Sequence, residues 1–410
     1  MFSPRKLLVN PFNSWKNVLK VLAYSTHPLG ETTTLYDFHV KRGGKMVNFG
    51  GFILPVQYSD QSIVNSHLFT RKSASIFDVS HMLQTEITGK NCVEYLETLC
   101  TADIQGLKEN SATLTVFTNE KGGILDDLIV TKINEEFLYV VSNAAMKDQD
   151  QGIMLSGLAN YKKLHHLDSD IIIKFLEPKA RSLVALQGPR AATALQKLAN
   201  VDLSTLYFMN SVVTNVGDIE CRITRCGYTG EDGFELSIDS KHVEKIVTLL
   251  LDDGEVKLAG LGARDSLRLE AGLCLYGSDL NSSTTPIEGA LTWLVAKRRR
   301  EQQNFPGASK IVQQIKEGSK VKRVGVASTL GPPARHGAKV LDKDGNVIGE
   351  ITSGCPSPTL NLNIGMGYVP TEFSKAGTKV GLKIRNKTFE GVVTKMPFVK
   401  AKYYNKPKVN

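Results

Sequence analysis

The 410-residue sequence lacks the short motifs that would assign it to several large enzyme classes. It contains neither the G-K-[ST] ending of a phosphate-binding loop nor the G-x-G-x-x-G pattern of dinucleotide-binding folds. The H-E-x-x-H pattern of zinc peptidases and the G-x-S-x-G pattern of serine hydrolases are also absent. These absences argue against nucleotide-dependent, zinc-dependent and serine-nucleophile chemistry.

Cysteines and long apolar runs are scarce as well. The six cysteines form no C-x-x-C pair, so the sequence predicts neither a metal site nor a disulfide scaffold. No apolar run reaches the roughly 18 residues that a membrane-spanning helix needs. Aromatic residues are not interleaved with basic ones, and no nucleic-acid motif is present. We therefore expect neither a nucleic acid nor a membrane among the partners.

Acidic residues are missing from the first 30 positions. The formal net charge of the whole chain is +9, and this segment contributes +4 of it through Arg5, Lys6, Lys16 and Lys20. A short helix there would place apolar side chains on one face. A basic, amphipathic segment without acids is typical of a mitochondrial transit peptide, and a merely disordered basic start is the alternative. We expect residues 1–30 to be such a peptide, which would direct the protein to the mitochondrial matrix.

The length favours two or three domains rather than a single core. Mixed helix and strand patterns over residues 31–300 predict an α+β body, with helices at 59–72, 91–100, 190–199, 243–251 and 263–271. Short strands joined by turns follow, and a Lys-Asp-Gly-Asn hairpin signal stands at residues 343–346. The sequence therefore predicts a C-terminal β-barrel-like domain over residues 315–400.

Two adjacent carboxylates open an otherwise apolar strand within residues 122–130. Asp126 and Asp127 follow a Gly-Gly turn and precede the run Leu-Ile-Val. Because neighbouring residues of a strand point to opposite faces, only one of the two should face a cleft. The alternative is that both carboxylates simply complete the turn, as Asp often does beside glycine.

Two further segments hold polar residues in patterned surroundings. The glycine-rich run 225–233 permits tight bends and leads into a strand on which Glu235 faces either a cleft or solvent. On the expected helix 263–271, Arg264 shares a face with Leu267, while an Asp265–Arg268 pair offers an ordinary surface alternative. His81 is more typical of a structural residue than of a catalytic base.

Four consecutive basic residues occupy positions 297–300. Such a run either meets a polyanion or forms the solvated end of a charged helix, and composition alone favours the solvated helix end.

Several long segments resemble the aminomethyltransferase family, the T-proteins of glycine cleavage systems. The resemblance runs in order through nearly all of residues 33–404. It is carried by residues 35–39 (Leu-Tyr-Asp-Phe-His), 77–82, 117–127, 225–233, 263–272 and 352–358 (Thr-Ser-Gly-Cys-Pro-Ser-Pro).

The resemblance implies a fold and a reaction. The family fold is a cloverleaf of three subdomains around a central folate channel, two of them interleaved in the body. The enzyme takes an aminomethyl group from the dihydrolipoyl arm of the H-protein and transfers its carbon to tetrahydrofolate. The products are 5,10-methylenetetrahydrofolate, ammonia and the reduced lipoyl arm. The P- and L-proteins belong to the same system.

The resemblance also implies roles for individual residues. The second carboxylate of the Gly-Gly-x-x-Asp-Asp motif, Asp127, is the expected catalytic group. It would orient the folate and stabilise a cationic, iminium-like carbon. Glu235 matches a pterin-binding glutamate. The remaining expected folate contacts are Arg264, Tyr403, Asn143, Tyr228, Met82, Leu114 and Trp293. In this context the basic run 297–300 would meet either the glutamate tail of folate or the acidic carrier protein.

A folate-binding iron–sulfur cluster assembly factor of the same fold is the alternative. Those relatives carry a Lys-Gly-Cys-Tyr-x-Gly-Gln-Glu signature, whereas residues 225–232 read Arg-Cys-Gly-Tyr-Thr-Gly-Glu-Asp. The retention of Asp127 also favours the transferase.

Overall fold

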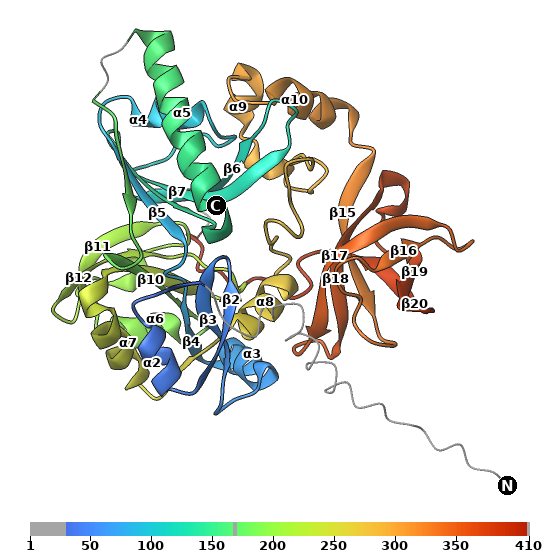
Figure 1. The fold of residues 1–410 in the computed structure, drawn as a ribbon, viewed down its shortest axis with the longest axis horizontal. Coiled ribbons are helices and arrows are strands. Elements are labelled where there is room, and N and C mark those ends of the chain that lie inside the picture. Colours follow the sequence, from blue (N-terminus) through green and yellow to red (C-terminus); the bar gives the residue numbers. More distant parts are fainter. Residues whose placement is uncertain (1–29, 167–169, 408–410) are drawn as a thin grey trace.

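A computed structural model describes residues 30–166 and 170–407 of the chain. The expected transit peptide falls on residues 1–30 and therefore lies almost entirely outside the described residues. The described chain forms three lobes, two of which are mixed α+β units and one of which is all β (Figure 1). This architecture confirms the predicted α+β fold class with a C-terminal barrel.

The first lobe is built on a six-stranded sheet. Its strand order is β11 (Ser211–Val216), β12 (Ile219–Thr224), β13 (Gly233–Asp239), β10 (Arg181–Gln187), β4 (Ala74–Asp78) and β14 (Val256–Leu258). A small sheet accompanies it, in the order β1 (Glu31–Thr32), β3 (Phe52–Tyr58) and β2 (Gly44–Phe49). The helices of this lobe are α2 (Tyr36–Lys41), α3 (Ile63–Lys72), α6 (Ala191–Gln196), α7 (Val243–Leu251) and α8 (Leu261–Glu270).

The second lobe interrupts the first along the chain. Its five-stranded sheet runs in the order β6 (Ser111–Thr118), β7 (Ile124–Asn134), β8 (Phe137–Ser142), β5 (Leu83–Thr88) and β9 (Ile172–Leu176). Helices α4 (Cys92–Glu97), α5 (Lys147–His165), α9 (Lys297–Gln302) and α10 (Ala308–Glu317) lie against it in Figure 1. Because β4 and β10 pair in the first lobe while the second lobe lies between them in sequence, the two lobes are interleaved.

The third lobe is a closed barrel. Its order is β15 (Val321–Ser328), β18 (Leu362–Pro370), β17 (Val347–Ser357), β16 (Lys339–Leu341), β19 (Lys379–Ile384) and β20 (Lys387–Thr394). Closure removes the exposed strand edges of an open sheet. The expected hairpin at residues 343–346 joins β16 to β17.

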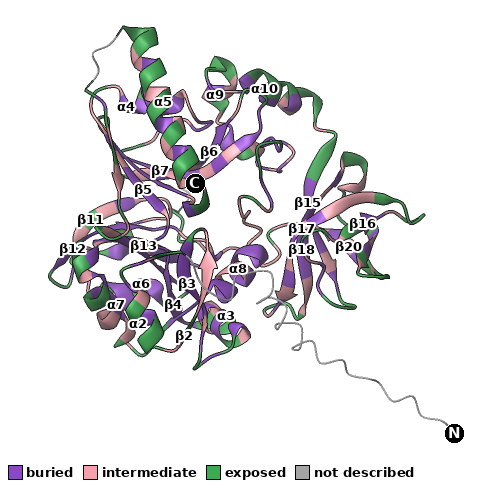
Figure 2. Ribbon diagram, viewed as in Figure 1, coloured by how far each residue is buried: buried purple, intermediate pink, exposed green. Residues whose placement is uncertain are grey.

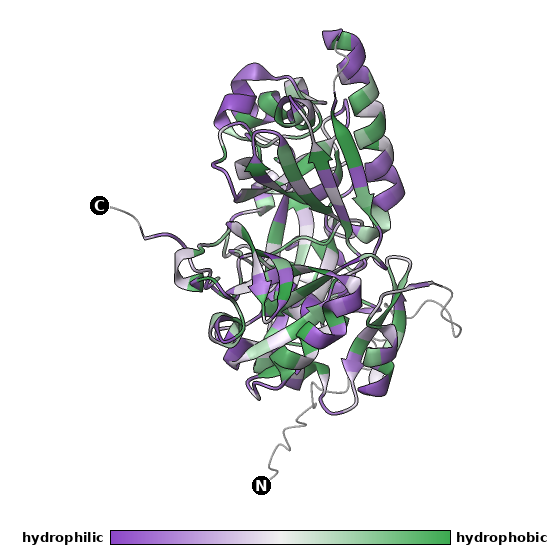
Figure 3. Ribbon diagram, turned by 90° about the vertical axis from the view of Figure 1, so that its left-hand side faces the viewer, coloured by the Kyte–Doolittle hydropathy of each residue, from purple (hydrophilic) through white to green (hydrophobic). Residues whose placement is uncertain are grey.

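Each lobe has its own apolar core. Ile76, Val184 and Leu236 are buried in the first lobe, Val130 in the second and Val340 in the barrel. In the view turned by 90°, the two α+β lobes lie one above the other and their strands are largely hydrophobic (Figure 3).

Some helix bounds differ from the sequence-based prediction. The expected helix at 59–72 begins only at Ile63, because the Ser62 side chain accepts a hydrogen bond of 3.1 Å from the Asn65 N–H and so caps the helix. The expected caps, Ser59 and Asp60, lie instead in the turn that follows β3. The helix predicted at 91–100 ends at Glu97.

The 19-residue helix α5 had no counterpart among the predicted elements. Only Asp150, Met154 and Tyr161 are buried in it, so its apolar stripe is too narrow to give a clear period in the sequence. Its outer surface is exposed (Figure 2).

We predict opposite effects on stability for two glycine substitutions. In Gly123→Ala the new methyl group would lie 1.9 Å from the Ser282 carbonyl oxygen, so the β6–β7 hairpin and the Ser282 segment must separate. The expected cost is about 1–3 kcal/mol in the free energy of unfolding. In Gly152→Ala, within α5, the methyl group meets no atom within 4 Å and should stabilise the helix by up to about 1 kcal/mol. Denaturant unfolding of both variants measures this, and equal stabilities would contradict the contact at Ser282.

Candidate active site

A large cavity, of about 1400 Å³, lies where the three lobes meet. Gly50 and Arg264 line it from the first lobe, Leu114 and Asp127 from the second, and Thr352 from the barrel. Its walls are mainly apolar, with a few polar groups directed inward, which is typical of a site for a flat organic ligand.

All nine residues predicted for the site line this one cavity. The nine are Met82, Leu114, Asp127, Asn143, Tyr228, Glu235, Arg264, Trp293 and Tyr403. They come from both α+β lobes, from the segment after α8 and from the C-terminal tail. Trp293 differs from the rest because it is 63% exposed and therefore stands at the mouth.

The two adjacent carboxylates of β7 face opposite ways, as strand alternation predicts. Asp127 lines the cavity, whereas Asp126 is fully buried on the other face of the strand. The Asn143 side-chain amide joins them, since its Nδ2 donates to Asp126 Oδ1 at 2.8 Å and to Asp127 Oδ1 at 3.1 Å. Burial, together with the nearby charge of Asp126, raises the pKa of Asp127 to about 7.

A second polar group faces the cavity from the first lobe. Glu235 of β13 and Arg264 of α8 both line it, and the Arg264 guanidinium lies 4.8 Å from the centre of the Tyr228 ring. Burial raises the pKa of Glu235 and lowers that of Arg264, and the charge of each partly offsets the shift of the other. Arg264 Nη1 is buried without a hydrogen-bond partner, which leaves a donor for a ligand.

The C-terminal tail supplies the last wall. Tyr403 stacks on Phe208, with ring centres 4.1 Å apart and planes 9° apart. The Lys402 N–H donates to the Gly230 carbonyl at 2.8 Å, and its side chain pairs with Glu231 at 3.2 Å. These contacts fix the tail against the glycine-rich run 225–233.

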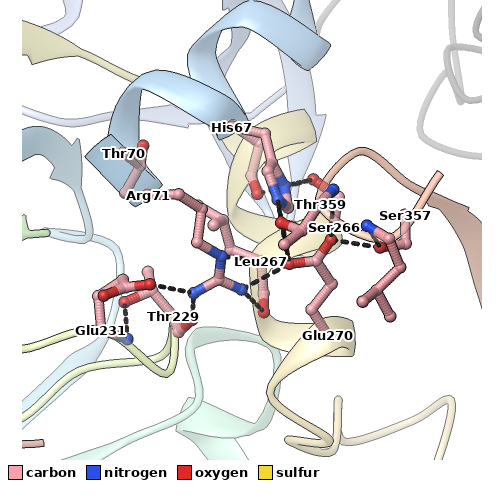
Figure 4. A network of polar contacts seen from close by, with 12 residues as sticks. His67, Thr70, Arg71, Thr229, Glu231, Ser266, Leu267, Glu270, Ser357 and Thr359 are labelled. Atoms are coloured by element: carbon pink, nitrogen blue, oxygen red, sulfur yellow. Dashed lines mark hydrogen bonds and ion pairs between the residues drawn. The ribbon is translucent and has the colours of Figure 1, made fainter. Parts of the chain in front are cut away.

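A buried polar network behind the cavity joins the lobes (Figure 4). Its centre is Glu270 of α8, whose carboxylate pairs with Arg71 of α3 at 2.8 Å. His67 of α3 donates from Nε2 to the same oxygen at 3.1 Å, and burial lowers the pKa of His67. Arg71 also reaches Glu231 at 3.0 Å.

The barrel joins this network through its 357–359 segment. The Ser357 hydroxyl donates to Glu270 Oε1 at 2.5 Å, and the Thr359 N–H donates to the same oxygen at 3.1 Å. Although burial alone would raise the pKa of Glu270, the hydrogen bonds from His67 and Ser357 and the charge of Arg71 lower it to about 2. One carboxylate thus connects two helices of the first lobe to the third lobe.

The basic run 297–300 does not form the solvated helix end that composition favoured. Arg299 is fully buried and donates to the Glu97 carbonyl, and Arg298 pairs with both Glu97 and Asp103. Arg300 donates to two carbonyl oxygens of its own segment. These arginines attach α9 to α4, and they are therefore occupied within the chain.

Sequence reasoning missed three groups around the cavity. Phe208 supports Tyr403, and nothing in its local pattern indicated this. His81 lines the cavity with Nδ1 buried and unpartnered, and burial lowers its pKa to about 4. Asp150 of α5 lies behind Asp127, on a helix that the sequence did not predict.

Within residues 30–166 and 170–407, no cluster of three or more His, Cys, Asp or Glu side chains is arranged to hold a metal ion. No helix in that part of the chain is long and apolar enough to cross a membrane.

Comparison with known proteins places this arrangement in one family. The N-terminal domain of GCVT proteins matches residues 35–299, and the glycine cleavage T-protein C-terminal barrel domain matches residues 322–400. The chain therefore belongs to the glycine cleavage T-protein family. Within that family it is an aminomethyltransferase, a transferase of the glycine cleavage system.

Individual relatives cover almost the whole chain. The mitochondrial aminomethyltransferase of Canis lupus familiaris is 51% identical over 373 residues, which is 91% of each chain. That of Flaveria pringlei is 46% identical over 391 residues, 95% of this chain and 94% of its own. The crystal structure of the glycine cleavage system aminomethyltransferase T from Bartonella henselae superposes with a TM-score of 0.85 at 37% identity, covering 92% of this chain and all of that one.

We predict that the Glu270 network is a major contribution to stability. Glu270→Gln removes the anion that faces the buried Arg71 guanidinium, and we expect it to cost roughly 3 kcal/mol or more in the free energy of unfolding. Asp218→Asn is the matched control, because it breaks an exposed, solvent-screened pair with Lys245 and should change the stability far less. Denaturant unfolding compares the two variants, and a Glu270→Gln cost no greater than that of the control would contradict the assignment.

Proposed function

We propose that the central cavity binds tetrahydrofolate and that Asp127 is the catalytic group of the aminomethyl transfer. The observation that carries this proposal is that the nine residues implied by the family resemblance line one cavity, with a single carboxylate of the Asp126–Asp127 pair facing inward.

The Glu235 side of the cavity suits a pterin ring. A carboxylate can accept hydrogen bonds from the amino and ring N–H groups of a pterin, and Glu235 lines the cavity beside Arg264. The unpartnered Arg264 Nη1 offers a donor to a carbonyl oxygen. Met82, Leu114 and Tyr228 supply apolar and aromatic surface for the faces of a flat ligand. Tetrahydrofolate, when bound, supplies the nitrogen nucleophile that accepts the carbon.

Asp127 supplies the charge that the transfer requires. Positive charge develops on the carbon while its bond to sulfur breaks, and a fixed carboxylate nearby stabilises that charge without reorganising. The Asn143 amide holds Asp127 at 3.1 Å and fixes its orientation. The surrounding burial excludes water, which strengthens the electrostatic effect.

The partner that delivers the aminomethyl group is, in this proposal, the lipoylated H-protein, with the P- and L-proteins as further components of the system. The excess of basic residues in the C-terminal part of the chain supports binding of an acidic carrier protein. Residues 321–410 contain fifteen lysine and arginine residues against five acidic ones, a formal charge of +10 in a chain whose total is +9. Lys322 and Lys395 of this module lie at the cavity, where a lipoyl arm would enter.

We further propose a mitochondrial matrix location, with residues 1–30 as the transit peptide, because the aminomethyltransferases of Canis lupus familiaris and Flaveria pringlei are mitochondrial proteins and the leader has the required composition. For the mature chain we propose a folate-binding body over 31–300 and a barrel domain over 315–400.

Formation of 5,10-methylenetetrahydrofolate tests the proposed reaction. The purified chain is supplied with tetrahydrofolate and aminomethyl-loaded lipoyl H-protein. Product and ammonia should appear together and only when both substrates are present. Folate binding without product would reject the proposal and favour the iron–sulfur assembly alternative.

We predict that Asp127→Asn lowers turnover by ~10²-fold or more, because the amide keeps the shape of the carboxylate and loses its charge. Folding and tetrahydrofolate binding should persist. Glu120→Gln, in the exposed turn before β7, is the control and should keep wild-type turnover. Steady-state kinetics with saturating H-protein measure the effect, and wild-type turnover by Asp127→Asn would remove this residue from the mechanism.

The pH dependence follows from the same carboxylate. Since the ionised form is the active one and the pKa of Asp127 is raised to about 7, kcat/KM for tetrahydrofolate should fall as the pH drops through that value and level off above it. The residual activity of Asp127→Asn should lack this step. A wild-type midpoint near the ordinary Asp value would mean that the cavity does not raise the pKa of this group.

A further inference from the structure

Two fully buried carboxyl groups lie directly behind the cavity wall. Asp126 of β7 and Asp150 in the first turn of α5 are both 0% exposed, and their carboxyl groups are in hydrogen-bond contact with each other. Neither lines the cavity. The transfer reaction as described above assigns no role to Asp150.

The hydrogen bonds around the two groups are unequal. Asp126 receives two: the Asn143 backbone N–H donates to Oδ2 at 3.0 Å, and Asn143 Nδ2 donates to Oδ1 at 2.8 Å. Neither oxygen of Asp150 receives a hydrogen bond of good geometry from any N–H or O–H of the described residues. The Ser142 hydroxyl lies close enough to act against the raised pKa of Asp150, but it makes no hydrogen bond of good geometry.

Two carboxylates in contact and shielded from water cannot both stay ionised, because each penalises the charge of the other. One proton between them removes the repulsion and turns the contact into a strong hydrogen bond. Burial and the contact with Asp150 raise the pKa of Asp126. The two N–H donors on Asp126 nevertheless favour its ionised form, and Asp150 lacks such donors, so we place the proton on Asp150. The missing donors at Asp150 are then explained, since a protonated carboxyl group is itself the donor.

The pair connects to the catalytic carboxylate through one side chain. Asn143 Nδ2 donates to Asp126 Oδ1 and also to Asp127 Oδ1. Two further titratable groups interact electrostatically with the pair. They are Asp127 itself and Tyr276, which lies in the segment after α8. A negative charge at Asp126 therefore fixes the amide, and the amide fixes Asp127.

We propose that Asp150 holds a proton that it donates to Asp126, and that this proton-sharing pair positions Asn143 and, through it, Asp127. Asp150 is in this view a positioning residue of the transferase. The proposal rests on the catalytic role proposed for Asp127. If Asp150 holds the proton, the Asp126–Asp150 pair carries one negative charge at neutral pH. Loss of that proton would place a second negative charge behind Asp127.

Infrared spectroscopy of the full chain tests the proton without measuring activity. At about pH 8, one unit above the pKa of about 7 of Asp127, the wild type should show the C=O stretch of a buried protonated carboxyl group. Asp150→Asn should lack this band. Asp148→Asn, an exposed substitution in the same turn of α5, should keep it. Absence of the band from the wild type, or its persistence in Asp150→Asn, would overturn the proposal.

Kinetics test the positioning role. In Asp150→Asn the side-chain amide can donate to Asp126 at every pH, so turnover near neutral pH should stay within about twofold of the wild type. Asp150→Ala removes the donor and should lower kcat by ~10-fold or more with little change in KM for tetrahydrofolate, since Asp127 is then misplaced while the Glu235 side is intact.

An Asp150→Ala variant with wild-type kcat, or an Asp150→Asn variant as slow as Asp150→Ala, would contradict the positioning role. A failure of the proposed function gives a different pattern. In that case Asp127→Asn would turn over normally, while the infrared band would still respond to Asp150→Asn.

Discussion

The buried ion pair between Arg71 and Glu270 joins residues 199 positions apart in the chain, and the geometry of the site depends on it. Glu270 ends α8, the helix that carries Arg264 into the cavity. The same carboxylate accepts hydrogen bonds from Ser357 and Thr359 of the barrel. A buried charge of this kind is stable only with all its partners in place, so the pair imposes one relative arrangement on the first and third lobes. A cavity between lobes keeps its shape only under such a constraint.

The second constraint is the interleaving of the two α+β lobes. The strands that build the first sheet come from both before and after the second lobe in sequence, so the first sheet is complete only after the chain has passed through the second lobe. Asp127 and Glu235 are thereby carried to one cavity from two separate sheets. α9 then returns to the second lobe, where the buried Arg299 binds the end of α4.

Local sequence patterns predicted the features that depend on local physics. Strand alternation alone indicated that only one carboxylate of Asp126 and Asp127 would face the cavity, and the hairpin signal at 343–346 located a turn of the barrel. The resemblance to the family supplied the nine expected site residues, and all nine line the cavity. The patterns failed where the determining contact is distant in sequence. Arg299 looked like part of a solvated run because its partner Glu97 lies 202 residues earlier. The helix start at Ile63 was missed by a few residues because Ser59, Asp60 and Ser62 are all acceptable caps.

Helix α5 shows a different limit. Most of its side chains are exposed, and its position is set by the few that are buried against the second sheet. One of these is Asp150, and aspartate is a residue type that sequence-based reasoning places at the surface. Only a three-dimensional structure shows that this carboxyl group meets another one.

The place of Tyr403 in the chain has a consequence for biosynthesis. This wall of the cavity follows every helix and strand of the described chain, and it is fixed by stacking on Phe208 of the first lobe. A chain that emerges from its N-terminal end can therefore complete all three lobes while the cavity is still open on one side. Closure of this wall is then the last step in building the cavity.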